Sequence, residues 1–122
     1  MSTDLTPYHG KRAYVIGPWN PDGLTQISRV LDELTPTHLL HESKFGAQRA
    51  ARGWGWFWAK TKPLEVSVDP TFIATIRADY VLACYVDMDT PRPELRAVRD
   101  AHKAGIPVLR LRTSGAVEVY EP

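Results

Sequence analysis

The sequence predicts an α/β protein, a three-layer Rossmann-like sandwich built on a parallel sheet of about five strands. Three observations predict this fold. Short apolar runs rich in β-prone residues alternate with amphipathic helical patterns, which is typical of successive βαβ units. The length of 122 residues fits a single domain over 1–122. A composition of 43% hydrophobic and 24% charged residues gives that domain enough apolar side chains to bury a core.

The first predicted unit is a strand, a loop and a helix. Residues 1–11 are polar and mixed, and we expect a frayed lead-in there. Residues 13–16, AYVI, form the first strand, and Gly17 permits a sharp exit from it. Asn20 as N-cap, with a proline next to it, predicts a helix over 21–34. Its sheet-facing residues recur at helical spacing: Leu24, Ile27, Val30, Leu31 and Leu34.

The second predicted unit contains a less regular helix. Residues 37–41, THLLH, indicate a second buried strand, and Ser43 is the expected N-cap of the helix that follows. Gly53 and Gly55 each cost about 1 kcal/mol relative to Ala in a helix. We therefore expect the segment 54–60 to be kinked or separate from the first turns.

The rest of the chain continues the alternation. Residues 64–68 alternate in hydropathy as an edge strand does, and Asp69-Pro70 opens a short helix. Residues 79–86 form the most continuous apolar run and predict a central strand, with Cys84 in the core. The remaining expected elements are a helix over 95–102 ended by Gly105, a strand over 106–111 and an edge strand over 117–120.

The loop after the first strand is the first candidate for a ligand site. A helix start there offers free backbone N–H groups at the carboxyl end of a buried strand, where open α/β sheets bind small anionic or nucleotide-like ligands. Trp19 lies within this loop, so its ring could stack on a nucleobase; the alternative is a lid packed on its own domain. The loop suggests a class of ligand without naming a reaction.

Polar residues follow two other predicted strands. His41, Glu42 and Lys44 end the second strand, where they could form an acid/base cluster that also holds an anion. The alternative is that His41 only finishes the strand and the charges are solvated. Asp87 and Asp89 follow the most apolar run, where an Asp could contact a ribose hydroxyl or, with its neighbour, a divalent metal. A loop cap or turn is the alternative.

We expect a nucleotide or nucleotide-derived ligand across the ends of the first, second and fourth strands. The residues expected to contact it share a place at these carboxyl ends: Gly17, Trp19, Asn20, His41, Ser43, Lys44, Gly46, Asp87 and Thr90. Catalysis stays open; a hydrolase that cleaves the N-glycosidic or phosphate bond would use Glu42 or Asp87 as base or nucleophile. Neither a zinc site nor another cofactor is expected, because the one cysteine and the four histidines lack zinc-ligand spacing.

The stretch 44–62 supports an alternative function, nucleic-acid binding. It combines basic and aromatic residues and contains no acidic residue: Lys44, Arg49, Arg52, Lys60 and Lys62 with Trp54, Trp56, Phe57 and Trp58. Basic residues can clamp phosphates while aromatic rings stack on bases, at about 1 to 3 kcal/mol per stacked base. The net charge of +1 argues against a whole surface matched to nucleic acid. The same aromatic residues could instead be core or an oligomer contact.

The tryptophan spacing predicts assembly. At helical spacing the ring of Trp56 points away from the rings of Trp54 and Trp58, so at least one of the three should be exposed. An exposed aromatic patch usually marks a contact surface. We therefore expect a symmetric homodimer, or an assembly of higher order, with part of this patch in the interface.

Composition also bears on location. No run approaches the ~18 consecutive apolar residues of a membrane span. Residues 1–7 lack the basic and apolar regions of a signal peptide, and the lone Cys84 cannot form an internal disulfide. We expect a cytoplasmic protein with no membrane partner.

Three segments carry a family resemblance: YVIGPWNPDGLTQISRVLDEL, THLLHESKFGAQRA and ELRAVRDAHKAGIPVLRL. They resemble the SLOG superfamily of Rossmann-like nucleotide-ligand proteins, above all its YspA-like members. In that group the first strand ends in Gly-Ser-Arg, the second in His-Gly-Gly-Ala-Arg-Gly-Ala-Asp, and the last helix runs into Gly-Ile-Pro-Val. The corresponding places here are Gly17-Pro18-Trp19, residues 41–48 and Gly105–Val108. The resemblance implies a nucleotide-derived ligand at this edge.

The chain departs from the family pattern at the last helix. The family commonly presents Gly-Thr at the helix start, where this chain has Pro93-Glu94. Pro93 has no N–H to offer a phosphate, so we expect weaker phosphate binding there. The related nucleoside deoxyribosyltransferases carry a Glu nucleophile at the place that the spacing from Gly105 assigns to Ala97. Glu94 is nearly a turn away, which argues against that glycosidase chemistry.

Overall fold

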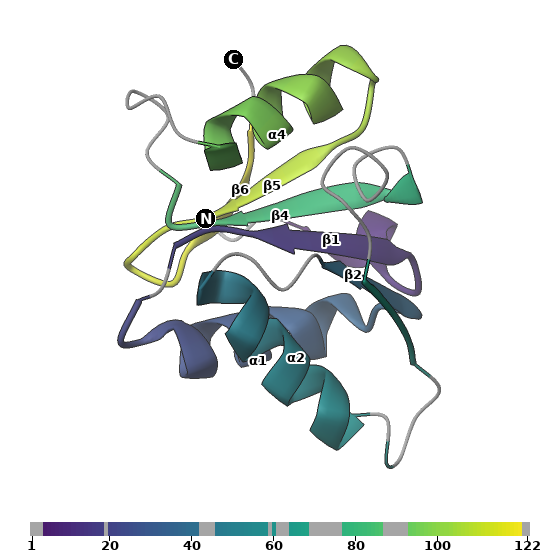
Figure 1. Ribbon diagram of the computed structural model, residues 1–122, viewed down its shortest axis with the longest axis vertical. Coiled ribbons are helices and arrows are strands. Elements are labelled where there is room, and N and C mark those ends of the chain that lie inside the picture. Colours follow the sequence, from purple (N-terminus) through teal and green to yellow (C-terminus); the bar gives the residue numbers. More distant parts are fainter. Residues whose placement is uncertain are drawn as a thin grey trace.

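The computed structural model describes residues 4–18, 20–41, 46–58, 60, 64–68, 77–86 and 93–120. Within them the predicted Rossmann-like sandwich is confirmed, because one sheet lies between two layers of helices (Figure 1). The strands are β1 (Arg12–Ile16), β2 (His38–His41), β3 (Glu65–Val68), β4 (Tyr80–Cys84), β5 (Val108–Leu111) and β6 (Val117–Val119). The helices are the short 3-10 helix η1 (Thr6–Tyr8), α1 (Gly23–Leu34), α2 (Gly46–Trp58) and α4 (Pro93–Lys103).

The described sheet is parallel apart from one edge strand. Its order is β3-β2-β1-β4-β5-β6, and β6 runs antiparallel to β5. β1 and β4 form the central pair, with Tyr14 opposite Val81. The chain lays down β2 and β3 on one side of β1 and then crosses to place β4 and β5 on the other. The predicted edge strands at 64–68 and 117–120 therefore lie at the edges of the described sheet.

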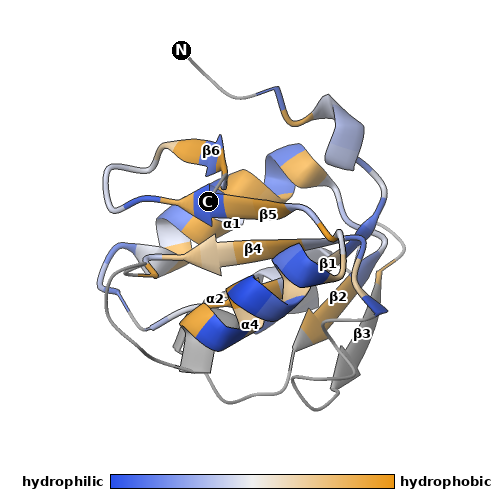
Figure 2. Cartoon of the chain, turned by 90° about the horizontal axis from the view of Figure 1, so that it is seen from above, coloured by the Kyte–Doolittle hydropathy of each residue, from blue (hydrophilic) through white to orange (hydrophobic). Residues whose placement is uncertain are grey.

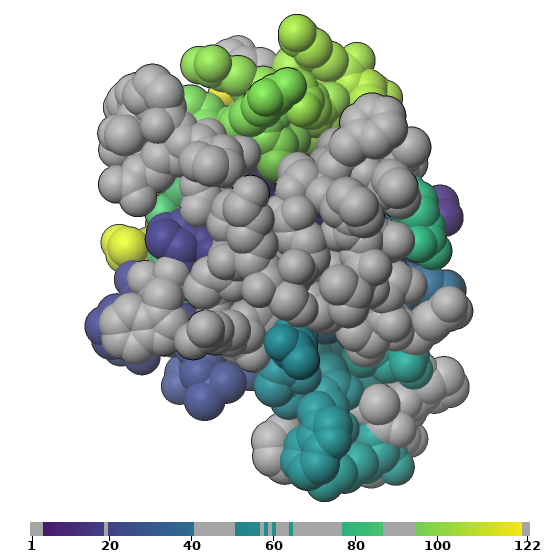
Figure 3. Space-filling view, viewed as in Figure 1, coloured from purple at the N-terminus to yellow at the C-terminus, as the bar shows by residue number. Residues whose placement is uncertain are grey.

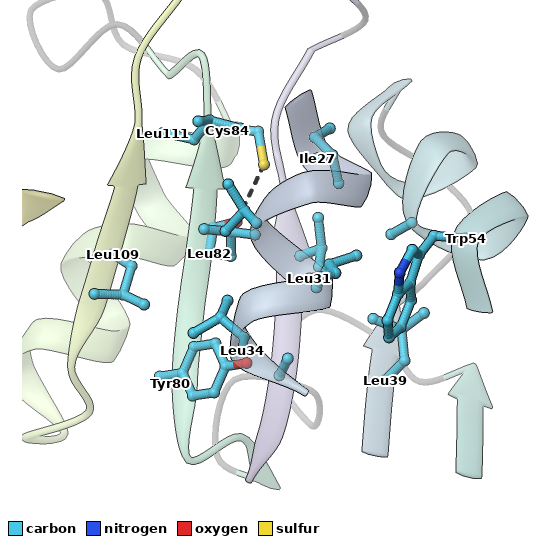
Figure 4. Close-up of a cluster of buried hydrophobic side chains, with 14 of the residues drawn as sticks. Ile27, Leu31, Leu34, Leu39, Trp54, Tyr80, Leu82, Cys84, Leu109 and Leu111 are labelled. Atoms are coloured by element: carbon cyan, nitrogen blue, oxygen red, sulfur yellow. Dashed lines mark hydrogen bonds between the residues drawn. The ribbon is translucent and has the colours of Figure 1, made fainter. Parts of the chain in front are cut away.

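The core has two parts because alternate residues of a strand face opposite sides of the sheet. The larger part lies under α1 and α2, and Figure 4 shows Leu82 and Cys84 of β4 in it, with Trp54 of α2 beside Leu39 of β2. The smaller part lies under α4 and includes Val98. In Figure 2, β2 and β5 are mostly orange whereas α4 is largely blue, as expected for a helix with one face in water.

The lead-in to the sheet is packed, so the expectation of a frayed segment is wrong for residues 5–10. Leu5 is 7% exposed and belongs to the larger core cluster. The ring of Tyr8 lies edge-on to the ring of Tyr80, with centroids 5.5 Å apart. The Gly10 N–H donates to the carbonyl oxygen of Thr35 at 3.1 Å. Sequence reasoning missed these contacts because isolated apolar residues make no periodic pattern.

α1 begins at Gly23, two residues later than predicted, and its N-cap is Asp22 rather than Asn20. The Asn20 side chain instead closes a turn in the loop before the helix, where its Oδ1 accepts the N–H of Asp22 at 2.9 Å. One of the residues predicted to face the sheet does not, since Leu24 is 62% exposed. It lies beside α2, because a Cβ at Gly53 would lie 4.0 Å from its Cδ1.

α2 is one continuous helix from Gly46 to Trp58, so the expected separation of the segment after its glycines is wrong as far as Trp58. Nε1 of Trp54 donates to Oδ1 of Asp32 in α1 at 2.8 Å. The same ring stacks on Trp58, with centroids 4.9 Å apart. Contacts between α1 and α2 hold the helix through Gly53 and Gly55, whose combined propensity cost is about 2 kcal/mol.

The central strand and the last helix agree with the sequence pattern. All five residues of β4 are buried, and the strand lies between β1 and β5. α4 is followed by Gly105 at φ +75°, the left-handed conformation that favours glycine after a helix. The short helix predicted after Asp69-Pro70 lies outside the described residues apart from Arg77.

Candidate functional site

The carboxyl ends of β1 and β4 mark the point where the strand order reverses. α1 follows β1 on one face of the sheet, and α4 follows β4 on the other (Figure 1). In open α/β sheets, ligands bind outside the strand ends at such a switch point. This edge of the sheet is therefore the candidate site.

Gly17 brings the loop after β1 against the end of β4. Its φ is +138°, and a Cβ at this position would overlap the carbonyl oxygen of Cys84. Only glycine satisfies both conditions. Gly17, predicted as a site residue, thus lies at the switch point itself.

Asn20 shapes the same loop. Its side chain accepts the Asp22 N–H, and its carbonyl oxygen accepts the Gly23 N–H at 2.9 Å. The two bonds form a turn that leads into α1. Two backbone N–H groups that the sequence predicted to be free for a ligand are therefore used within the loop.

Tyr85 was not among the predicted site residues, yet it stands at the centre of this edge. It follows β4 with φ +60°, a conformation that bulky residues rarely adopt. Its hydroxyl donates to Oε1 of Gln26 at 2.6 Å, and Nε2 of Gln26 donates to the carbonyl oxygen of Thr113 at 3.1 Å. Tyr85 therefore joins the ends of β4 and β5 to the first turns of α1.

The backbone of Tyr85 ends the apolar run that the sequence assigned to one strand. Its N–H still donates to Leu111 in β5 at 2.9 Å, but its positive φ turns the chain out of the sheet. Strained conformations of this kind cost about 1 to 3 kcal/mol and cluster at functional sites. No sequence pattern predicts a tyrosine with positive φ, because tyrosine strongly prefers negative φ.

A pocket of about 230 Å³ lies beside Tyr85 at the ends of β4 and β5. Its lining residues come from both strand ends: Tyr85, Val86, Arg110, Leu111, Arg112 and Thr113. Neither arginine was predicted as a site residue. The sequence could have indicated them, because two arginines at alternate positions at the end of a buried strand place two cations on one side of the sheet.

The other predicted site residues are described only in part. His41 is the last residue of β2, paired with Val68, and Gly46 is the first residue of α2. Parallel pairing brings the end of β2 to the same edge as the ends of β1 and β4. The remaining predicted residues lie outside the described part of the chain: Trp19, Glu42, Ser43, Lys44, Asp87, Asp89 and Thr90.

The described part of the basic and aromatic stretch lies on α2 and, at Lys60, just after it. Trp54 is buried and stacked on Trp58, whereas Trp56 is 64% exposed. The prediction that at least one ring is exposed is therefore confirmed. Nζ of Lys60 lies 3.8 Å above the ring of Trp56. In Figure 3 the side chains of α2, in teal, lie at the opposite end of the molecule from those of α4, in light green.

The described residues include neither a cluster suited to a metal ion nor a helix suited to spanning a membrane. No group of three or more His, Cys, Asp or Glu side chains among those residues is arranged to hold a metal ion. No described helix is both long and apolar enough to cross a bilayer.

No protein-family model, curated protein or solved structure matches this chain.

Proposed function

We propose that this protein binds a nucleotide or nucleotide-derived small molecule at the carboxyl edge of its sheet. The observation that carries the proposal is that the Gly17 loop and Tyr85 lie at the switch point, with an arginine-lined pocket beside Tyr85 at the ends of β4 and β5. Cations suit phosphate oxygens, and polar loop groups suit a ribose. The SLOG-like segments agree with this ligand class. Catalysis is not part of the proposal.

The proposal extends to the strand-end residues that the sequence singles out. Trp19 would stack on the base, and the backbone at Gly17 and Asn20 would approach the sugar and phosphate. The remaining contacts would come from loops at the ends of β2 and β4: His41, Ser43, Lys44, Gly46, Asp87 and Thr90.

A melting experiment with a panel of nucleotides and nucleosides tests this function. A ligand present at 100 times its Kd stabilises the folded state by about 2.7 kcal/mol, so the melting temperature should rise by several degrees with at least one member. Asn20→Ala alters the turn that shapes the loop and should reduce that rise. Lys103→Gln, at the far end of α4, should retain it. A panel without any shift for the wild type would reject the function.

We also propose that the protein is a symmetric homodimer whose interface includes Trp56 of α2. Trp56 and Leu24 are more than 60% exposed and lie on the neighbouring helices α1 and α2. Large exposed apolar side chains are enriched at contact surfaces. Molar mass in solution should correspond to two chains for the wild type and to one for Trp56→Ala. A monomeric wild type at high micromolar concentration would reject the dimer.

We place the protein in the cytoplasm. Cys84 is a free thiol buried in the central strand, and free thiols suit a reducing compartment. Cell fractionation should recover the full chain with cytosolic markers, and recovery with membranes or with secreted protein would contradict this location.

A further inference from the structure

Two guanidinium groups line the pocket at the ends of β4 and β5. Arg110 lies in β5 and Arg112 directly after it, and residues two apart along a strand project to the same side of the sheet. Both line the same pocket of about 230 Å³. Their side chains are 26% and 51% exposed, so a ligand in the pocket can reach both.

Glu118 of β6 positions these two groups. Its Oε1 accepts from Nε and Nη2 of Arg112, each at 2.9 Å, and lies 3.7 Å from Nη1 of Arg110. Arg110 also donates from Nη2 to the carbonyl oxygen of Val86 at 3.5 Å. A guanidinium carries five N–H donors, more than these contacts use. Two cations and one carboxylate leave this cluster with a net positive charge.

Tyr85 also lines the pocket and adds no charge to it. Its hydroxyl proton is donated to Gln26, and burial raises the pKa of Tyr85 to about 12, so the side chain is neutral at pH 7. Nε2 of Gln26 also donates to the carbonyl oxygen of Thr113, another residue that lines the pocket. An anion that enters the pocket meets two preplaced cations and no charge from the tyrosine.

We propose that this pocket is the anion subsite of the ligand site and binds a phosphate group through Arg110 and Arg112. Arginine matches phosphate geometry with paired N–H donors. Pockets for whole ligands measure roughly 300 to 1,000 Å³, so this smaller one suits a single group of a larger ligand. The identity of the rest of that ligand rests on the function proposed above.

The start of α4, on the same edge, lacks one of the backbone N–H groups that could bind a phosphate. That helix begins at Pro93, which has no N–H to donate. The ends of β4 and β5 place the charge one strand further along the same edge.

Calorimetric titration with three sets of probes tests the subsite: the four ribonucleoside 5′-monophosphates, the matching nucleosides, and inorganic phosphate. We expect wild type to bind at least one monophosphate tenfold or more tightly than its nucleoside. Arg110→Gln and Arg112→Gln should each weaken that monophosphate at least tenfold and change nucleoside binding less than twofold. The unchanged nucleoside binding shows that the variants are folded. Arg96→Gln, an exposed arginine of α4, should bind like wild type.

The outcomes separate the two proposals. Equal binding of monophosphates and nucleosides by wild type, or monophosphate binding that both arginine substitutions leave unchanged, overturns the subsite and leaves the proposed function standing. No binding of any nucleotide or nucleoside rejects the proposed function. In that case inorganic phosphate bound by wild type and lost in Arg110→Gln still supports the subsite, and phosphate that does not bind overturns both.

Discussion

Gly17 is the residue on which the geometry of the candidate site depends most directly. Its positive φ and its contact with the Cys84 carbonyl group place the chain where β1 and β4 diverge. Tyr85, also at positive φ, turns the chain out of the sheet one residue after Cys84. These two backbone conformations set the positions of the loops that would hold a ligand. Both are local features with effects that a substitution can measure.

Gly17→Ala should destabilise the fold by about 3 kcal/mol or more, because the new methyl group overlaps backbone that cannot give way. Gly10→Ala is the matched control, since it also has positive φ but nothing lies within 4 Å of its Cβ position. That control should cost only about 1 kcal/mol of left-handed strain. Urea unfolding measures both, and equal losses would show that the close approach to Cys84 is unimportant.

Arg12 and Asp79 form a charged pair at the amino ends of β1 and β4. Oδ2 of Asp79 accepts the Arg12 backbone N–H at 2.8 Å, and both carboxylate oxygens lie 3.3 Å from guanidinium nitrogens. The Arg12 hydrogen bond lowers the pKa of Asp79. A lowered pKa means that the pair stabilises the fold above the ordinary carboxyl pKa of ~4 and that this contribution is lost as pH falls through the folded value.

Asp79→Asn should therefore cost stability at pH 7 and progressively less below pH ~4. The loss of stability at pH 7 should be about 0.5 to 1 kcal/mol, because the two side chains are 45% and 34% exposed and water screens their charges. Urea unfolding across this pH range gives the profile. In a double-mutant cycle with Arg12→Gln, the double variant should lose less stability than the sum of the two single losses. A loss that grows toward low pH would contradict the assignment.

At the scale of elements, α2 shows how one face of a helix can serve the core while another faces outward. Trp54 is anchored by Asp32 and by Trp58, whereas Trp56 carries Lys60 above its ring. The two tryptophans are two residues apart in the helix, so their directions differ by about half a turn. Their energetic roles should differ accordingly.

Trp54→Phe should destabilise the protein by about 1 to 3 kcal/mol, since it removes a hydrogen bond to a carboxylate and leaves Asp32 without its indole donor. Trp56→Phe is the matched substitution at an exposed site and should change the unfolding free energy by no more than about 0.5 kcal/mol. Denaturation of both variants at concentrations where the wild type has one oligomeric state provides the measurement. A larger loss for Trp56→Phe would place that ring, instead of Trp54, in the stabilising contact.

The sequence predicts elements better than it predicts their ends. Apolar periodicity finds β1, β4 and α4, because burial on one or both faces dictates it. The start of α1 was placed wrongly because Asn20 can cap a helix or close a turn, and only the surrounding chain decides between the two. The continuity of α2 was missed because the contact between Trp54 and Asp32 joins helices that are separate in sequence.

At the scale of the whole molecule, the strand order places the candidate site, and the sequence supports that order only through right-handed crossovers. Gly17 was predicted from its place after an apolar run. Arg110 and Tyr85 were not, because their roles arise from cross-strand contacts with Glu118 and from a tie to Gln26. Hydropathy periodicity identifies a strand, but it does not tell which other strands will be its neighbours in the sheet.

The packing of the lead-in is a whole-molecule feature that can also be tested. Leu5→Ala should cost about 2 kcal/mol or more, because the side chain is buried in the larger core cluster. Leu24→Ala makes the same chemical change at a leucine that is 62% exposed and, in the Trp56→Ala background that we expect to be monomeric, should cost within about 0.5 kcal/mol. Thermal or urea unfolding distinguishes them. Similar small losses at both positions would return the lead-in to a frayed segment.

Cys84 gives the molecule a built-in reporter of its own opening. The thiol lies under α1, its Sγ 3.9 Å from the carbonyl oxygen of Leu82, and burial raises its pKa (Figure 4). Only an exposed thiolate reacts with an alkylating reagent, so labelling has to wait for β4 to separate from α1. The labelling rate thus measures the free energy of that local separation, one residue from Tyr85. A ligand that holds the ends of β1 and β4 together would slow this reaction, because it stabilises the closed form relative to the open one.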